Sequence, residues 1–367
     1  MENIVLLGAG HANLEVIKHL SPSARTKCRI VLVSESDRIF YSGLLPRHIM
    51  GEVKIDELTI DLTTFCKAKG VDLIISSAKS ISPTKKAIDL QNGNSIVFDY
   101  LIINTGGETT RLQTNAPFRT IYVKPLPTFI EQWREVQRIC SSCQRLDFVI
   151  VGGGAASVEL AIAIKLRLLN NNSIGSSVHI ITRGDRLCEN YTSAISTELE
   201  RATAALGIVI HYEENLTAIP ESEIVLTDGK RLSYDYVFVS LPITPHEWNS
   251  KQSIDVDSNG YFLVDDYLRC SSNIYAAGDC SKMKSYPNLA KSGVIAVRQG
   301  QYLAKHLDSV LNKNKILPFL PSKKQLNILV SGSAQALLIF GSVYFKSSLS
   351  LKIKNWIDQR YMNSFLD

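Results

Sequence analysis

The sequence lacks several features that would place it in a familiar class. No run of Lys and Arg reaches the roughly five to eight residues expected of a nucleic-acid patch, so we expect no nucleic-acid partner. The longest apolar stretch, around residues 336–345, is interrupted by Gly341 and Ser342 and is about half the roughly 20 residues that a membrane-spanning helix needs. No basic segment followed by an apolar one opens the chain, so we expect no secretory signal.

Cysteine is sparse, and its pattern does not indicate a disulfide framework. The seven cysteines are an odd number scattered along 367 residues, which favours free thiols and a cytoplasmic location. The length suits two or three domains, and the net charge of +5 is only mildly basic. This charge suits an anionic ligand such as a dinucleotide, or an acidic membrane surface, without requiring either.

The start of the chain has the pattern of a dinucleotide-binding unit. A short apolar run, residues 4–7, leads directly into Gly8 and Gly10, and a helix-like segment follows. Gly8 permits a tight turn, and Gly10 lets the backbone approach a pyrophosphate at the helix N-terminus. Asn13 replaces the third glycine of the usual motif, so a strand–helix unit without a ligand stays an alternative. His11 either forms a hydrogen bond near the pyrophosphate or packs on the sheet.

The same pattern recurs in the middle of the chain. An apolar run at residues 148–151 leads into Gly152 and Gly154, and a helical segment rich in Ala and Leu follows. The third glycine is again replaced, here by the small residue Ser157. Two such turns in one chain are improbable by chance, and they indicate one flavin and one nicotinamide cofactor.

In each unit, the residue after the second strand is expected to influence which nucleotide is bound. The strand at residues 29–33 is followed by Glu35, whose carboxylate would bind a ribose hydroxyl. The strand at residues 178–181 is followed by Arg183, which can pair with a 2′-phosphate where a carboxylate would repel it. We therefore favour NADPH over NADH at the second turn; poor discrimination, or a solvated arginine without a ligand role, are the alternatives.

Two further strands end in residues that a flavin domain needs. One ends in Thr105 and Gly106, and the other ends in Gly278 and Asp279. With these residues the sequence resembles the two-dinucleotide-binding-domain flavoproteins of the pyridine nucleotide-disulfide oxidoreductase superfamily, which include glutathione reductase and the type II NADH dehydrogenases. The resemblance implies FAD together with NADPH or NADH as cofactors. It also implies that Asp279 binds the ribityl chain of the flavin.

One subgroup of this superfamily is more similar than the rest. It consists of flavoproteins found fused to selenide, water dikinases and also occurring alone, and the chain resembles the stand-alone form. On this resemblance Leu44 is assigned to the cofactor site, and any link to selenium is an association through these relatives. The resemblance rests on motifs at residues 41–46, 60–62, 123–125, 244–248, 291–300 and 356–358.

Three stretches depart from the superfamily's pattern. Residues 41–50 contain no cysteine where enzymes similar to glutathione reductase carry a C-x4-C pair. Residues 239–242 read Val-Ser-Leu-Pro where a second Thr-Gly is usual, so we expect a different turn where the chain returns to the flavin domain. Gly293 and Val294 stand where type II NADH dehydrogenases have an Ala-Gln pair near the quinone, so a quinone pocket would be built differently.

These observations predict an α/β fold of two Rossmann-like dinucleotide-binding domains with a small α+β C-terminal region. We expect an FAD domain split between residues 1–115 and 246–313, and an NAD(P) domain at residues 116–245. Residues 314–367 are predicted to form a hairpin and a helix.

The predicted C-terminal helix, residues 351–365, is amphipathic. It either covers the core of its own domain, forms a homodimer interface, or docks peripherally on the inner face of a membrane. Its apolar side is predicted to consist of Leu351, Ile353, Ile357, Tyr361 and Phe365.

Two side chains are candidates for a direct part in the chemistry. Hydride transfer needs alignment and electrostatics more than reactive groups. The resemblance aims the N-terminus of the helix that starts near residues 289–293 at the flavin, where its dipole favours negative charge. Lys291 would add a positive charge there, unless it is a solvated lysine at the helix start. Glu159 matches the superfamily's glutamate near the nicotinamide carboxamide.

The favoured function is that of an FAD-dependent NAD(P)H dehydrogenase with a quinone or another small molecule as electron acceptor. A dithiol reductase that uses Cys140 and Cys143 is an alternative, and so is a flavin-binding regulatory protein without turnover. Phe129, Trp133 and Cys140 share one face of a helix predicted at residues 128–140, which favours a core role for Cys140. The arginine that follows the pair would lower a thiol pKa, so the redox alternative stays open.

Overall fold

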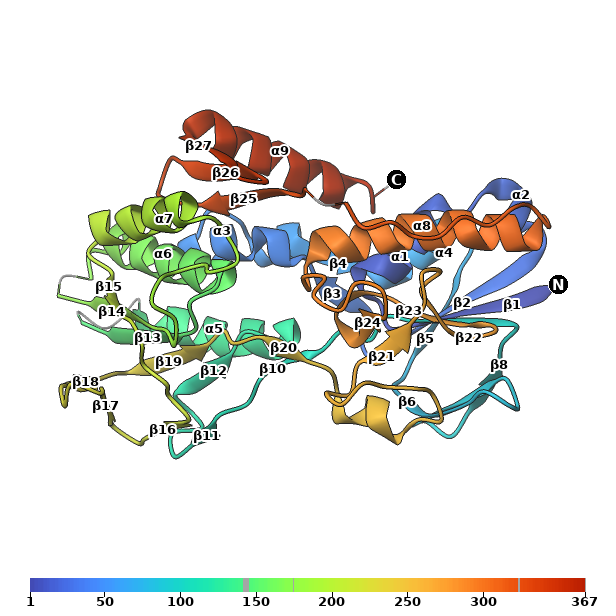
Figure 1. The fold of residues 1–367 in the computed structure, drawn as a ribbon, viewed down its shortest axis with the longest axis horizontal. Helices are drawn as coiled ribbons and strands as arrows, with labels where there is room; N and C mark the ends of the chain where they lie inside the picture. Colours follow the sequence, from blue (N-terminus) through green and yellow to red (C-terminus); the bar gives the residue numbers. More distant parts are fainter. Residues whose placement is uncertain (141–144, 174, 323, 367) are drawn as a thin grey trace.

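The computed structural model describes residues 1–140, 145–173, 175–322 and 324–366. Two mainly parallel sheets lie side by side, and a three-stranded antiparallel sheet with one helix lies over the junction between them (Figure 1). This arrangement confirms the α/β fold class and the two Rossmann-like units.

The first sheet has six strands in the order β22-β23-β9-β1-β2-β5. All neighbouring strands pair in parallel except β22 and β23. Its central strands are apolar because both of their faces are buried. The strands are β1 (Glu2–Leu7), β2 (Cys28–Ser34), β5 (Asp72–Ile75), β9 (Tyr100–Ile103), β22 (Arg269–Ser271) and β23 (Ile274–Ala276).

Helices α1 (His11–His19) and α8 (Gly293–Leu311) pack closely together against this sheet (Figure 1). Shorter elements surround the sheet and its two helices. They are α2 (Pro22–Arg25), β3 (Arg38–Phe40), η1 (Ser42–Leu44), α3 (Leu45–Met50), η2 (Ile55–Leu58), β4 (Thr59–Asp61), α4 (Leu62–Ala68), β6 (Ala78–Ser82), β7 (Ala87–Leu90), β8 (Ser95–Val97), η3 (Glu247–Lys251), β21 (Phe262–Val264), η4 (Gly278–Cys280) and β24 (Ser281–Met283).

The second sheet is parallel, with the strand order β12-β19-β13-β14-β15. Successive residues of β13 point to opposite faces: Phe148 joins the core that contains α5 and α6, and Val149 joins the core that contains β17 and β18. The elements are β12 (Thr120–Tyr122), α5 (Leu126–Cys140), β13 (Asp147–Val151), α6 (Ala155–Asn170), β14 (Ser177–Ile181), α7 (Ser193–Ala205), β15 (Val209–His211), β17 (Glu223–Val225), β18 (Arg231–Ser233) and β19 (Tyr236–Val239).

The two crossovers between the sheets run side by side. Strand β10 (Glu108–Thr109) on the outward crossover pairs antiparallel with β20 (Ile243–Thr244) on the return crossover. The return strand directly follows the Val-Ser-Leu-Pro stretch, so the chain comes back through a paired strand. A second short pair is formed by β11 (Gln113–Thr114) and β16 (Ala218–Ile219).

The C-terminal region consists of β25 (Leu326–Val330), β26 (Ala336–Phe340), β27 (Val343–Ser347) and α9 (Ser348–Asn363). The predicted hairpin is confirmed as β25–β26, and β27 adds a third strand to it. Helix α9 starts at Ser348, before the predicted residue 351. No helix in the described part of the chain is long and apolar enough to cross a membrane.

The face that α9 buries differs from the predicted apolar side. The side chains that are buried belong to Ser350, Lys354, Asp358 and Met362, whereas Leu349 and Trp356 are exposed. The prediction was right at Phe365, which is buried, and at Leu351 and Tyr361, which are partly buried and pack against the core. Ile353 and Ile357 are only partly covered, and the burial of Lys354 and Asp358 was not predicted. Periodicity alone could not show this, because polar partners on another segment hold the buried charges.

We predict that Gly300→Ala in α8 destabilises the fold. Alanine normally stabilises a helix interior relative to glycine. Here an added methyl group would lie 2.3 Å from the carbonyl oxygen of Ala12 in α1, so the helices must separate. We expect a loss of about 1–3 kcal/mol in the free energy of unfolding, measured by urea denaturation. The exposed control Lys305→Ala should change it by less than about 0.5 kcal/mol; a stabilised Gly300→Ala would contradict the close packing.

Candidate functional site

The first glycine turn lies against the end of the neighbouring strand β9. Gly8 has a φ of +89°, and a methyl group on it would lie 2.5 Å from the carbonyl oxygen of Asn104. A methyl group on Gly10 would lie 2.3 Å from the Asn104 side chain. Both glycines are therefore required by the approach of this turn to Asn104. Their contact with a pyrophosphate stays a prediction.

One side chain, that of Asn104, joins three segments of this site. Its Oδ1 atom accepts hydrogen bonds from the backbone N–H groups of Ala12 (3.0 Å) and Asn13 (3.3 Å) at the start of α1. Its Nδ2 atom donates to the carbonyl of Ala277 at 2.7 Å. Gly278 has a φ of +73°, and a methyl group on it would lie 2.5 Å from the same Nδ2 atom. The sequence reasoning missed Asn104, although a polar residue directly after a buried strand was visible.

Asn13 explains how the turn works without its third glycine. The side chain is fully buried, and its Nδ2 atom donates to the carbonyls of Leu7, Gly8 and Ile102 at 3.2, 2.7 and 3.3 Å. The amide group therefore ties the turn to strands β1 and β9, which is the close packing that a glycine usually permits.

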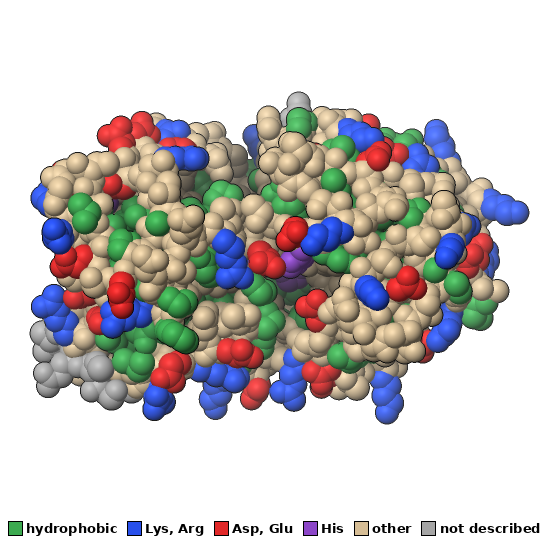
Figure 2. Space-filling model, turned by 90° about the horizontal axis from the view of Figure 1, so that it is seen from below, with side chains coloured by type: hydrophobic (Ala, Val, Ile, Leu, Met, Phe, Trp, Pro, Cys, Tyr) green, Lys and Arg blue, Asp and Glu red, His purple; other side chains and the backbone are tan. Residues whose placement is uncertain are grey.

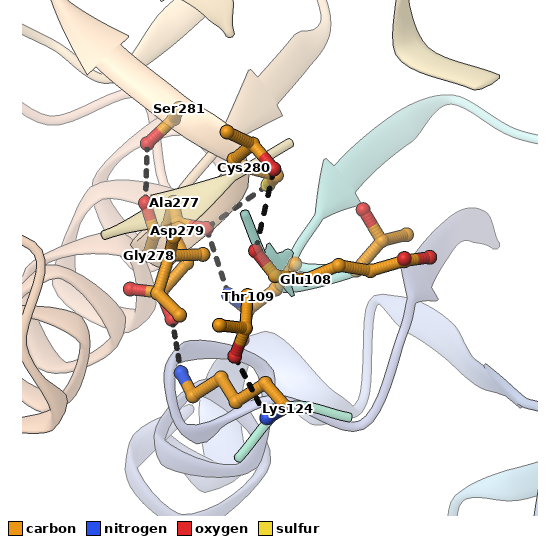
Figure 3. Close-up of polar contacts among 12 residues, drawn as sticks. Glu108, Thr109, Lys124, Ala277, Gly278, Asp279, Cys280 and Ser281 are labelled. Carbon is orange, nitrogen blue, oxygen red and sulfur yellow. Dashed lines mark hydrogen bonds and ion pairs between the residues drawn. The ribbon is translucent and has the colours of Figure 1, made fainter. Parts of the chain in front are cut away.

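Asp279 is paired with Lys124, which lies at the start of the second unit. The Lys124 Nζ atom lies 2.5 Å from Asp279 Oδ2, and the Lys124 backbone N–H donates to Thr109 at 2.9 Å (Figure 3). The Asp279 carboxylate, predicted to bind the ribityl chain, thus sits in a site built from both units. Lys124 lies in the motif at residues 123–125, but no role was predicted for it from the sequence.

The two crossovers meet beside this pair. His246 Nδ1 lies 3.0 Å from Glu108 Oε1, and His246 Nε2 lies 3.2 Å from the carbonyl oxygen of Thr105. Figure 2 shows the furrow between the two halves of the molecule from below, with acidic, basic and histidine side chains gathered beside it. Gly106, next to Thr105, has a φ of +75°, and a methyl group on it would meet no described atom within 4 Å.

The predicted helix start near residues 289–293 is confirmed, because α8 begins at Gly293 with Ser292 as its cap. The cap hydroxyl accepts a hydrogen bond from Ile295 N at 3.3 Å. Lys291 donates to the carbonyl of Ser281, and its Nζ lies 4.5 Å from the centre of the Tyr261 ring. A role for Lys291 beside the flavin stays a prediction.

Two other residues assigned to the first nucleotide have clear positions. Glu35 is exposed directly after β2 and accepts a hydrogen bond from the Ser77 hydroxyl at 2.9 Å. Leu44 is buried at the end of η1. The contact of Glu35 and of Leu44 with a cofactor stays a prediction.

His11 is the first residue of α1. Its Nδ1 atom lies 2.8 Å from the hydroxyl of Tyr361 on α9. Burial lowers the pKa of His11 to about 4, so the ring is uncharged at neutral pH. Its partner is therefore the C-terminal helix, an interaction that neither sequence-based alternative included.

The second glycine turn leaves space on one side. Gly152 has a φ of +132°, and a methyl group on it would lie 2.4 Å from the carbonyl of Ser240, to which Ser157 also donates at 3.3 Å. A methyl group on Gly154 would meet no described atom within 4 Å. Arg183 is exposed two residues after the end of β14. The contacts of Gly106 and Gly154 with a bound dinucleotide stay a prediction.

Glu159 in α6 contacts the C-terminal sheet. Its Oε1 atom accepts a hydrogen bond from Val330 N of β25 at 2.8 Å, and burial raises the pKa of its carboxyl. The C-terminal sheet therefore covers the start of α6. The predicted contact of Glu159 with the nicotinamide stays untested.

The Cys140 side chain is 3 % exposed and shares the buried face of α5 with Phe129 and Trp133, which confirms its predicted core position. Burial is typical of a structural thiol. Cys143 lies outside the described residues. Within the described ranges, no three His, Cys, Asp or Glu side chains group in a way that could hold a metal ion.

Two nucleotide turns on two parallel sheets, joined by paired crossovers, define a two-domain dinucleotide-dependent oxidoreductase. Residues 2–300 match the family model described as pyridine nucleotide-disulphide oxidoreductase, and the chain belongs to this family. Membership confirms the predicted superfamily and an enzyme that uses FAD and NAD(P)H. The more specific likeness to the dikinase-fused subgroup stays a prediction.

Three similar proteins illustrate the range of the likeness. A "Probable NADH dehydrogenase" of Dictyostelium discoideum is 22% identical over 356 residues, covering 87% of this chain and 76% of that protein. The "Demethylphylloquinone reductase NdbB" of Synechocystis sp. is 23% identical over 336 residues, covering 86% and 81%. The structure of NDH2 from Plasmodium falciparum in complex with NADH has a TM-score of 0.85 at 18% identity, covering 100% of this chain and 97% of that one. The chain spans about half the length of the dihydrolipoyl dehydrogenases it also matches.

We predict that Asn104→Ala loosens the first site. The substitution leaves the Ala277 carbonyl and two N–H groups of α1 without their buried partner. We expect a loss of about 3 kcal/mol in the free energy of unfolding and a lower flavin-to-protein absorbance ratio. The exposed control Asn259→Ala should leave both unchanged. Full flavin content and stability in Asn104→Ala would refute the role of this side chain.

We predict that Gly154→Ala separates stability from nucleotide binding. Its φ of −82° suits alanine, and the methyl group meets open space, so the free energy of unfolding should change by less than about 0.5 kcal/mol. The methyl group would occupy the space of the dinucleotide, so the Kd for NAD(P)H, measured by fluorescence titration, should rise about tenfold or more. Unchanged affinity would show that the nucleotide does not approach this glycine.

Proposed function

We propose that the chain is an NAD(P)H dehydrogenase that passes electrons through FAD to a quinone or another small acceptor. The observation that carries the proposal is the pair of glycine turns, Gly8–Gly10 after β1 and Gly152–Gly154 after β13, on two sheets whose crossovers pair. The segment where a disulfide reductase of this family would carry its dithiol, residues 41–50, has no cysteine. This favours an external electron acceptor over a disulfide of that type.

The names of the relatives support a quinone as the acceptor class. The Synechocystis relative is named a demethylphylloquinone reductase, and potato relatives are named NAD(P)H-ubiquinone oxidoreductases. These likenesses are distant, so the particular acceptor is part of the proposal.

The chain's own residues provide binding, alignment and charge. Gly8 and Gly10 hold the FAD pyrophosphate at the start of α1, and Asp279 holds its ribityl chain beside Lys124. Gly154 opens the second site to NAD(P)H, and Arg183 favours a 2′-phosphate there. When bound, the two cofactors supply the hydride transfer. The N-terminus of α8, with Lys291 before it, provides positive potential for the charge that reduction adds.

Anaerobic titration with NADPH and NADH, followed by flavin absorbance, tests this function. We expect complete bleaching by one equivalent of nucleotide per flavin, since only the flavin accepts electrons. Uptake of two equivalents, reduced to one in Cys140→Ser, would support the dithiol reductase instead. No bleaching with either nucleotide would support a regulatory flavoprotein.

We further propose that α9 docks the enzyme on an anionic membrane. Its outward face exposes Leu349 and Trp356 (63 % and 60 %), with the cations Lys352 and Arg360 on the same face. The Arg360 guanidinium lies 5.3 Å from the Trp356 ring centre. Exposed Phe345 on β27 extends the apolar surface. Apolar side chains with interspersed cations are typical of a helix that lies in a lipid interface.

Co-sedimentation with vesicles tests the docking. We expect the protein to bind phosphatidylcholine vesicles that contain phosphatidylglycerol, and a Leu349→Ser/Trp356→Ser variant to bind about tenfold more weakly because buried apolar area is lost. Gln359→Ser, exposed on the same helix, is the control. Absence of vesicle binding would refute docking. A dimer in light scattering that the double variant dissociates would instead assign this face to a homodimer.

A further inference from the structure

Helix α9 points charged side chains inward. Lys354 and Asp358, one turn apart, are 8 % and 3 % exposed, while apolar Leu349 and Trp356 face solvent. A helix that only covers a core would bury its apolar side. Removing two charges from water is unfavourable, and an apolar pair of similar volume is often as stable or more so. The inward pair therefore calls for a role other than packing.

The buried pair holds the turn formed by residues 41–44. Lys354 Nζ lies 3.2 Å from Asp358 Oδ2 and donates to the carbonyl of Gly43 at 3.2 Å. Asp358 Oδ1 accepts a hydrogen bond from the Tyr41 hydroxyl at 2.9 Å. The C-terminal helix thus fixes, through both charges, the turn that carries Leu44.

This turn borders the proposed flavin site, at the start of α1, through His11. The Tyr41 and His11 rings meet edge to face, with centroids 5.8 Å apart. The hydroxyl of Tyr361 in α9 forms a hydrogen bond with the same histidine. A methyl group on Gly293, the first residue of α8, would lie 3.6 Å from the His11 ring. The N-termini of α1 and α8 therefore meet at the uncharged His11. The Lys354–Asp358 pair is connected to this histidine through Tyr41.

The field of Lys354 also reaches the second unit. It lowers the pKa of Glu159 in α6, opposing the rise that burial causes, while Asp358 adds to that rise. Lys354 and Asp358 therefore act on groups of both nucleotide-binding units from the junction between them.

We propose that Lys354 and Asp358 set the reduction potential of the bound flavin, Lys354 favouring the reduced form and Asp358 opposing it. Reduction by two electrons adds negative charge, which a nearby cation stabilises and a nearby anion destabilises in a region shielded from water. The balance of the pair thereby decides which acceptors the enzyme can reduce. The inference rests on the proposed function only in taking FAD as the electron carrier.

The test is the midpoint potential of the bound flavin, measured by dithionite titration against reference dyes. We expect Asp358→Asn to raise the potential and Lys354→Met to lower it. Each shift should be on the order of tenfold in the equilibrium constant, or about 30 mV for two electrons. Lys354→Arg, which keeps the charge, should stay near the wild-type value. Lys352→Met on the exposed face is the matched control and should not shift it.

The double variant Lys354→Met/Asp358→Asn keeps the test valid when a single variant does not fold. It removes both charges, so we expect a potential near the wild-type value and near-normal stability. Its difference from Asp358→Asn isolates the charge of Lys354. Shifts of equal sign in the two single variants, or no difference between Asp358→Asn and the double variant, would overturn the inference.

The potential is measured without NAD(P)H or a quinone, so the two proposals fail separately. Opposite shifts in a protein that NAD(P)H does not bleach would leave the charge pair standing and refute the dehydrogenase. Bleaching of the flavin by NAD(P)H, with midpoint potentials that do not shift in the variants, would support the dehydrogenase and refute the role of the charge pair.

Discussion

The first nucleotide site depends on the hydrogen bonds of a single amide, that of Asn104. The side-chain oxygen accepts hydrogen bonds from two backbone N–H groups at the start of α1. The side-chain nitrogen donates to the carbonyl of Ala277, the residue before Gly278 and Asp279. Because Asn104 lies between three strand ends, Gly10 and Gly278 must approach its side chain, and Gly8 its backbone carbonyl, without a Cβ atom. Packing around Asn104 is therefore a sufficient reason for this glycine pattern, apart from the predicted approach of a ligand.

Much of the fold could be predicted because its signals are local. Strands buried on both faces must be apolar, and a tight turn into a helix needs glycine, so β1 and β13 were evident from residues 4–7 and 148–151. The helical spacing of Phe129, Trp133 and Cys140 likewise placed α5 and its buried face. In each case the residues themselves carry the constraint.

The parts that could not be predicted depend on partners distant in sequence. Asn104 gains its role only when residues 12 and 277 are brought to it, and Lys124 meets Asp279 only after the chain has crossed between the sheets. The burial of Lys354 and Asp358 in α9 was not predicted for the same reason. The spacing of apolar residues predicts that the least polar face of a helix is buried. A Lys–Asp pair can nevertheless be buried where another segment supplies hydrogen bonds to it.

The two faces of α9 are linked because they belong to one rigid element. The outer face presents tryptophan, leucine and cations, and the inner face holds Lys354 and Asp358 against Tyr41 and Gly43. A partner that displaces the outer face of α9 also displaces the buried pair, because a helix moves as a unit. Coulomb interactions in a region shielded from water change steeply with distance. On the two proposals above, contact with a surface would be transmitted to the electrostatics of the flavin site through this helix, without any change in the glycine turns.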